Sequence, residues 1–129
     1  MNFSSDTAAP AHPAILEAML AASKGPASSY GADPWTEAAR KALRDVFETD
    51  LDVWFVSSGT AANALALATL CPSHGGVLCH AEAHIERDER GAPEFFTGGA
   101  KLSLLPGRHG RIDLGALRSA TVSDRKSVV

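Results

Sequence analysis

Two hydroxyl residues flanking a glycine, Ser58-Gly59-Thr60, are the strongest local signal for chemistry in this 129-residue chain. They follow a short apolar run at 52–56, typical of a buried strand, and precede an Ala/Leu-rich segment at 61–70, typical of a buried helix. A helix N-terminus presents unpaired N–H groups and a partial positive charge, so the turn predicts a phosphate site. The alternative is that Ser58 or Thr60 only caps the helix. The turn matches neither G-x-G-x-x-G nor the P-loop pattern, which argues against dinucleotides and ATP.

Two histidines, His80 and His84, follow the apolar residues of a second expected strand at 77–80. On one helix they would share a face at a spacing that suits zinc, although no third ligand is evident. An imidazole at a strand end could instead stack on an aromatic cofactor whose phosphate binds at the preceding turn. A third interpretation is that both side chains are hydrated at the surface. The nearby carboxylates Glu86 and Glu89 are interpreted as a solvated helix face.

The pattern of the remaining chain predicts the elements that must position these residues. Apolar residues at helical spacing begin after His12-Pro13 and end before Lys24, and Asp33 followed by Pro34 predicts a helix over 34–48. Downstream, expected strands alternate with helices, which is typical of βαβ units and a mainly parallel sheet. The strands are expected at 52–56, 77–80 and 101–105, and the helices at 61–70, 82–90 and 113–118.

Composition narrows the function classes. Hydrophobic residues make up 45% of the chain and the net charge is −3, so no cationic footprint for nucleic acid is present. No leader-like segment or membrane-spanning apolar run is found, and no membrane partner is expected. Cys71 and Cys79 are interpreted as buried, reduced thiols of a cytoplasmic protein.

Taken together, four short motifs resemble the N-terminal part of threonine aldolases, which are pyridoxal-phosphate enzymes of the aspartate-aminotransferase fold. The resemblance extends from about Phe3 to the helix expected to end near Ala120, and its specificity lies in the combination of motifs. The motifs are Ser5-Asp6-Thr7, Tyr30-Gly31-Ala32-Asp33-Pro34, Ser58-Gly59-Thr60-Ala61-Ala62-Asn63 and Ala83-His84.

The resemblance implies a site for pyridoxal 5′-phosphate and no metal. It implies that Ser58, Gly59 and Thr60 hold the 5′-phosphate of the coenzyme. It also implies that His84 stacks on the pyridine ring, which makes His84 the one catalytic residue assigned to this chain. The lysine that binds the coenzyme covalently is absent, because no lysine here stands in the family's context.

The resemblance further implies reversible cleavage of a β-hydroxy-α-amino acid, such as threonine, to glycine and an aldehyde. Ser5 matches a serine that binds the substrate, and Tyr30 lies in a loop that contributes to a site at the subunit interface. A homodimer or homotetramer is expected of the full-length enzyme. The alternatives are glycine hydroxymethyltransferase, a β-eliminating lyase, or a small non-catalytic phosphate- or metal-binding module.

The expected fold class is α/β, a partial three-layer αβα large domain in which N-terminal helices precede a mainly parallel sheet. Residues 1–50 are expected to form the N-terminal segment and helices, and 51–123 the start of the coenzyme-binding domain. Residues 124–129 resemble a non-native tail encoded by a sequencing adapter. We expect the chain to correspond to the first third of the enzyme and to be inactive alone.

Overall fold

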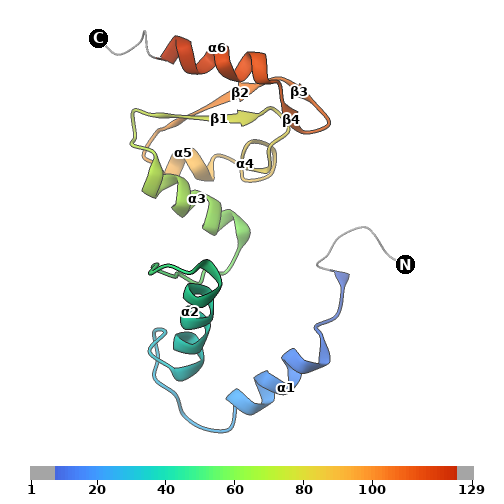
Figure 1. The fold of residues 1–129 in the computed structure, drawn as a ribbon, viewed down its shortest axis with the longest axis vertical. Coiled ribbons are helices and arrows are strands. Elements are labelled where there is room, and N and C mark those ends of the chain that lie inside the picture. Colours follow the sequence, from blue (N-terminus) through green and yellow to red (C-terminus); the bar gives the residue numbers. More distant parts are fainter. Residues whose placement is uncertain (1–7, 125–129) are drawn as a thin grey trace. The chain divides into compact units, whose positions relative to one another are not determined.

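A computed structural model describes residues 8–124 of the chain, with side chains up to residue 122 (Figure 1). Ser5, predicted to bind substrate, and residues 125–129 of the predicted tail lie outside the described residues. The chain divides into two compact units, one ending at Trp54 and the other beginning at Phe55. Within the described residues, no helix is both long enough and apolar enough to cross a membrane.

The first unit contains two helices, α1 (Pro13–Ala22) and α2 (Pro34–Phe47), both at the predicted positions. Each begins with a proline behind a capping side chain, because proline lacks the N–H that a first helical turn cannot pair. Nδ1 of His12 accepts a hydrogen bond from the N–H of Ala14 at 3.2 Å, and Asp33 caps α2. The start signals in the sequence are therefore confirmed.

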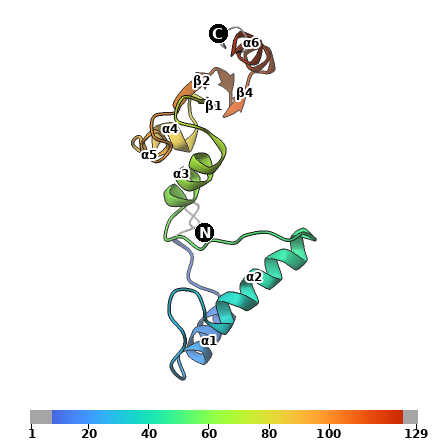
Figure 2. The same cartoon turned by 90° about the vertical axis from the view of Figure 1, so that its left-hand side faces the viewer.

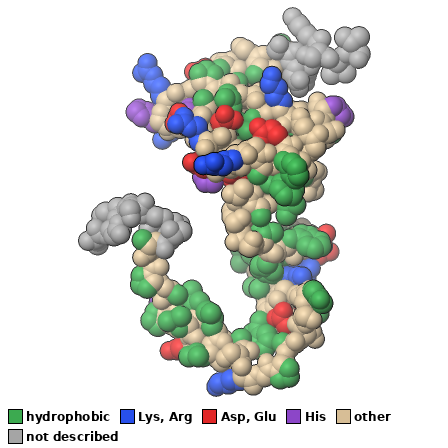
Figure 3. Space-filling model, turned by 180° about the vertical axis from the view of Figure 1, so that it is seen from behind, with side chains coloured by type: hydrophobic (Ala, Val, Ile, Leu, Met, Phe, Trp, Pro, Cys, Tyr) green, Lys and Arg blue, Asp and Glu red, His purple; other side chains and the backbone are tan. Residues whose placement is uncertain are grey.

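The apolar side chains of these two helices remain largely exposed. Trp35 and Phe47 of α2 are 48% and 64% exposed, and neither helix contains a buried residue. Figure 3 shows hydrophobic side chains at the surface of this unit. The described residues of this unit therefore form no buried core.

The second unit is built around two short parallel strands, β1 (Gly76–His80) and β2 (Lys101–Leu105). Gly76 pairs with Lys101 and His80 with Leu105, so both strands end at the same edge. Two two-residue strands, β3 (Gly107–Arg108) and β4 (Arg111–Ile112), form an antiparallel hairpin. The parallel pair was predicted, whereas the hairpin was not.

Helices lie on both sides of the parallel pair (Figures 1 and 2). On one side lies α6 (Leu114–Asp124), and on the other lie α3 (Gly59–Leu70), α4 (His84–Arg87) and α5 (Ala92–Phe96). α3 contacts α5, and Ala64 of α3 is fully buried. This layering confirms the predicted α/β class and partial αβα architecture. Among the described residues, the buried apolar ones are Ala64, Cys79, Pro93, Ala100, Leu102 and Leu105.

Three local predictions are wrong. Residues 52–56 form no strand, and Trp54 is 83% exposed, because the predicted strand needs partners that the described residues do not supply. The helix expected over 82–90 spans only α4, because left-handed Arg90 and Gly91 turn the chain. Cys79 is buried as predicted, but Cys71 is only half-buried.

Candidate coenzyme site

The turn at Ser58 forms the N-terminus of α3. The Oγ atom of Ser58 accepts a hydrogen bond from the N–H of Ala61 at 3.1 Å, so Ser58 is the N-cap. Among the described residues, no acceptor faces the N–H groups of Gly59 and Thr60. A Cβ atom built on Gly59 would meet no atom within 4 Å. Capping and anion binding are therefore compatible, because Ser58 pairs one N–H while two others stay open.

His84 is the first residue of α4, and its side chain is 64% exposed. Its Nδ1 atom lies 2.9 Å from Oε1 of Glu89. One edge of the imidazole is thus held by the protein, while the rest of the ring is accessible. This is the arrangement that a ring-stacking histidine needs.

His80 lies at the end of β1 and is buried, with 8% of its surface exposed. Its Nδ1 atom accepts a hydrogen bond from the N–H of Glu82 at 2.9 Å. Because His80 is in a strand and His84 begins a helix, the two do not share a helical face. Among the described residues, no group of three or more His, Cys, Asp or Glu is placed to hold a metal. The interpretation that both histidines lie at the surface therefore holds for His84, which is exposed, but not for His80, which is buried.

Glu89 is the residue of this candidate site that sequence reasoning missed. It was interpreted as part of a solvated face, but the residue is only 4% exposed and its side chain is fully buried. Arg90 and Gly91, with φ angles of 49° and 79°, reverse the chain directly after it. No local signal in the sequence could have found Glu89, because its burial depends on this reversal and on contact with the distant helix α3.

Asn63 joins the α3 turn to the histidine. Its Nδ2 atom donates to Oε1 of Glu89 at 2.7 Å, the same oxygen that Nδ1 of His84 contacts. Asn63 lies four residues after Gly59, which is about 6 Å along a helix axis. Through Glu89 and Asn63, the structure therefore links the predicted stacking residue to the helix that begins at the predicted phosphate turn.

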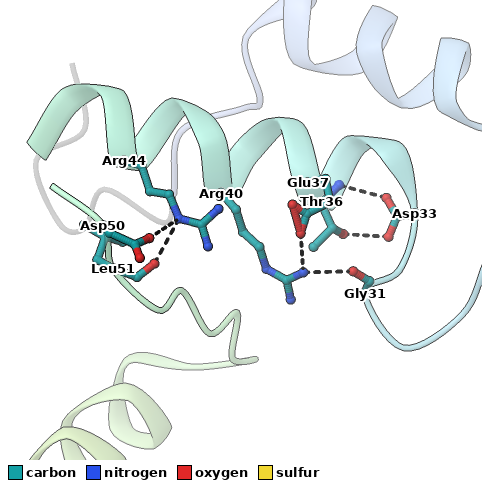
Figure 4. A network of polar contacts seen from close by, with 8 residues as sticks. All are labelled: Gly31, Asp33, Thr36, Glu37, Arg40, Arg44, Asp50 and Leu51. Atoms are coloured by element: carbon teal, nitrogen blue, oxygen red, sulfur yellow. Dashed lines mark hydrogen bonds and ion pairs between the residues drawn. The ribbon is translucent and has the colours of Figure 1, made fainter. Parts of the chain in front are cut away.

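Tyr30 belongs to the first unit and lies in the loop before α2, which is held by polar contacts (Figure 4). Tyr30 and Gly31 both adopt left-handed conformations, with φ of 61° and 74°. Nη1 of Arg40 donates to the carbonyl oxygen of Gly31 at 3.1 Å. The Tyr30 side chain is fully exposed. The loop conformation is thus fixed locally while the phenol is presented outward.

Residues 2–128 match the family described as beta-eliminating lyases. The chain belongs to this family. Among curated members, it is 45% identical over 123 residues to a low specificity L-threonine aldolase of Pseudomonas aeruginosa, covering 95% of this chain and 34% of that protein. It is 42% identical over 121 residues to a low specificity L-threonine aldolase of another Pseudomonas strain, covering 94% and 35%.

A solved structure gives the same family relationship in three dimensions. The chain resembles a threonine aldolase of Leishmania major with a TM-score of 0.78 and 28% sequence identity. The match covers 87% of this chain and 32% of that one. The chain therefore spans about a third of the length of the family members it matches.

Proposed function

We propose that this chain forms the N-terminal third of a pyridoxal-phosphate-dependent threonine aldolase. The observation that carries the proposal is the shared contact at Glu89, which links His84 to the helix that begins at Ser58. Identity of 42–45% to two L-threonine aldolases supports the same activity.

The donor set fits the coenzyme. The N–H groups of Gly59 and Thr60, with the hydroxyls of Ser58 and Thr60, suit the dianionic 5′-phosphate. The exposed imidazole of His84 offers a flat surface for the pyridine ring. When bound, the coenzyme supplies an electron sink for cleavage of the Cα–Cβ bond. The residues of this chain would anchor the coenzyme through its phosphate and orient its ring through His84.

The lysine that binds the coenzyme covalently is proposed to lie outside this chain. Lys24 follows α1, Lys41 lies on α2, Lys101 begins β2, and none of them is placed beside His84 by a contact in the structure. Lys126 lies outside the described residues. We therefore place the lysine that binds the coenzyme in the remaining two thirds of the enzyme, and we expect the 129-residue chain alone to be inactive.

The proposed substrates are L-threonine and related β-hydroxy-α-amino acids, which are cleaved to glycine and an aldehyde. Ser5 and Tyr30 are proposed to contact the substrate, Tyr30 through a loop that the Arg40 contact holds in shape. We propose a homodimer or homotetramer in the cytoplasm. The family description also favours a second candidate, a β-eliminating lyase acting on another amino acid.

A chimeric enzyme tests the proposal. Residues 1–123 of this chain replace the matching third of the Pseudomonas aeruginosa relative, and the product is assayed with threonine, phenylserine, and serine with and without folate. Release of glycine and aldehyde from threonine and phenylserine supports the aldolase. Coenzyme binding together with elimination activity but no aldehyde release would support the β-eliminating lyase instead. A folded chimera that binds no coenzyme would contradict both.

A further inference from the structure

Glu89 places a buried carboxylate between the two halves of the proposed coenzyme site. Its side chain is fully buried, whereas that of His84, 2.9 Å away, is 64% exposed. A carboxylate buried in this way needs donors, because an unpaired charge is costly away from water. Among the described residues, Asn63 and His84 are the donors that Oε1 contacts, and Oε2 has no hydrogen-bond partner.

An ionised carboxylate only accepts hydrogen bonds. In a contact between Nδ1 of His84 and an ionised Glu89, the proton lies on Nδ1, because the partner of one ring nitrogen sets which nitrogen carries the hydrogen. The Nε2 atom and the ring faces are left for the coenzyme. Because Asn63 donates to the same oxygen, the plane of the imidazole is fixed relative to the helix whose N-terminus would hold the phosphate.

We propose that Glu89 is a positioning residue that holds a proton on Nδ1 of His84 and sets the imidazole relative to the N-terminus of α3. This inference rests on the proposed function for the identity of the ligand, pyridoxal phosphate. As a consequence, the N-terminus of α3 and the imidazole of His84 are already fixed relative to each other before the coenzyme binds. Preorganisation of this kind increases affinity because fewer side chains must be ordered on binding.

The first test reads the histidine without any coenzyme. ¹⁵N NMR of the full 129-residue chain at pH 9 reports which ring nitrogens of His84 carry protons. The expected result is a proton on Nδ1, which is lost or mixed with the Nε2–H form in Glu89→Ala. In Glu89→Gln a mixture is expected, because an amide can either accept from Nδ1–H or donate to Nδ1. Protonation at Nε2 alone in the unsubstituted chain would overturn the inference.

The second test measures coenzyme affinity in the chimera by the absorbance of bound pyridoxal phosphate. Glu89→Ala is expected to weaken binding about tenfold, and Glu89→Gln less, since it retains an acceptor of the same shape. Glu86→Gln, a matched loss of a neighbouring carboxylate with no hydrogen bond to the site, is the control and should bind normally.

The outcomes separate the two proposals. If the unsubstituted chimera folds and binds no coenzyme, the proposed function fails, while the NMR result still decides whether Glu89 sets the His84 proton. If the chimera binds coenzyme and Glu89→Ala binds it equally well, the positioning role is overturned and the proposed function stands.

Discussion

Asn63 donates a hydrogen bond to Glu89, a residue 26 positions later in the chain, over 2.7 Å. The bond joins α3 to the turn that follows α4. Because Glu89 also contacts His84, this one pair determines whether the candidate site is a single structure or two separate elements.

Asn63→Ala should destabilise the second unit. The substitution removes one of the two donors to a buried carboxylate oxygen, and losing such a bond costs about 1–3 kcal/mol. Urea denaturation followed by far-UV circular dichroism measures the change. Thr69→Ala is the control, because its hydroxyl donates to the carbonyl of Leu65 within the same helix. Equal midpoints for the two variants would show that the Asn63–Glu89 bond contributes nothing to stability.

Ala64→Leu tests the packing of α3 against α5. Ala64 is fully buried, so three additional carbon atoms must displace neighbours at a cost of about 1–3 kcal/mol. Ala66 is exposed on the same helix, so Ala66→Leu should change the free energy of unfolding by less than about 0.5 kcal/mol. Similar losses in both variants would contradict the packing of α3 described above.

The sequence predicted correctly those elements that are determined by neighbouring residues, such as helix caps and short apolar runs. The cap at Asp33 fixes the start of α2, and the expected range 101–105 is that of β2. The predicted strand at 52–56 failed because a strand exists only with its neighbours. Residue type and spacing singled out the Ser58 turn and the His80/His84 pair as candidates, and the family resemblance selected His84, so both site roles stay predictions. Glu89 was missed because its burial depends on a left-handed turn and on contact with a distant helix, which no local pattern encodes.

Cys79 should react with alkylating agents more slowly than Cys71. Burial raises the pKa of the Cys79 thiol, and the negative charges of Glu86 and Glu94 raise it further. Less thiolate forms at a given pH, and access is restricted as well. At pH 8 we expect iodoacetamide to label Cys71 at least about tenfold faster, measured by mass spectrometry of the peptides. Equal rates would contradict the burial of Cys79.

The raised pKa of Cys79 also makes the stability of the fold depend on pH in the alkaline range. The folded-state pKa of Cys79 lies above its ordinary value of 9.0, so its contribution to stability is fully present below that value. It is lost as the pH rises through the folded-state pKa. Cys79→Ser should therefore lose less stability than the unsubstituted chain between pH 8 and 11, as measured by urea denaturation. If the stability of Cys79→Ser and of the unsubstituted chain fell equally over this pH range, the raised pKa of Cys79 would be contradicted.

Asp33 should make α2 sensitive to acid. The hydroxyl of Thr36 donates to Asp33 at 2.6 Å and its N–H donates at 2.8 Å, and these bonds hold the pKa of Asp33 below 3.8. The stabilising contribution is present above pH 3.8 and is lost as the pH falls through the lower folded-state pKa. Carboxyl chemical shifts of Asp33 give this pKa directly. Asp33→Asn, which caps equally well without titrating, should retain its helix signal at low pH.

The central claim is that the N-terminus of α3 and the imidazole of His84 bind one coenzyme molecule. A crystal structure of the chimera grown with pyridoxal phosphate tests it most directly. We predict a phosphate oxygen within hydrogen-bonding distance of the N–H of Gly59 or Thr60, and a pyridine ring stacked on His84 with the Glu89 contact intact. A phosphate bound away from α3, or a ring that does not face His84, would contradict the account.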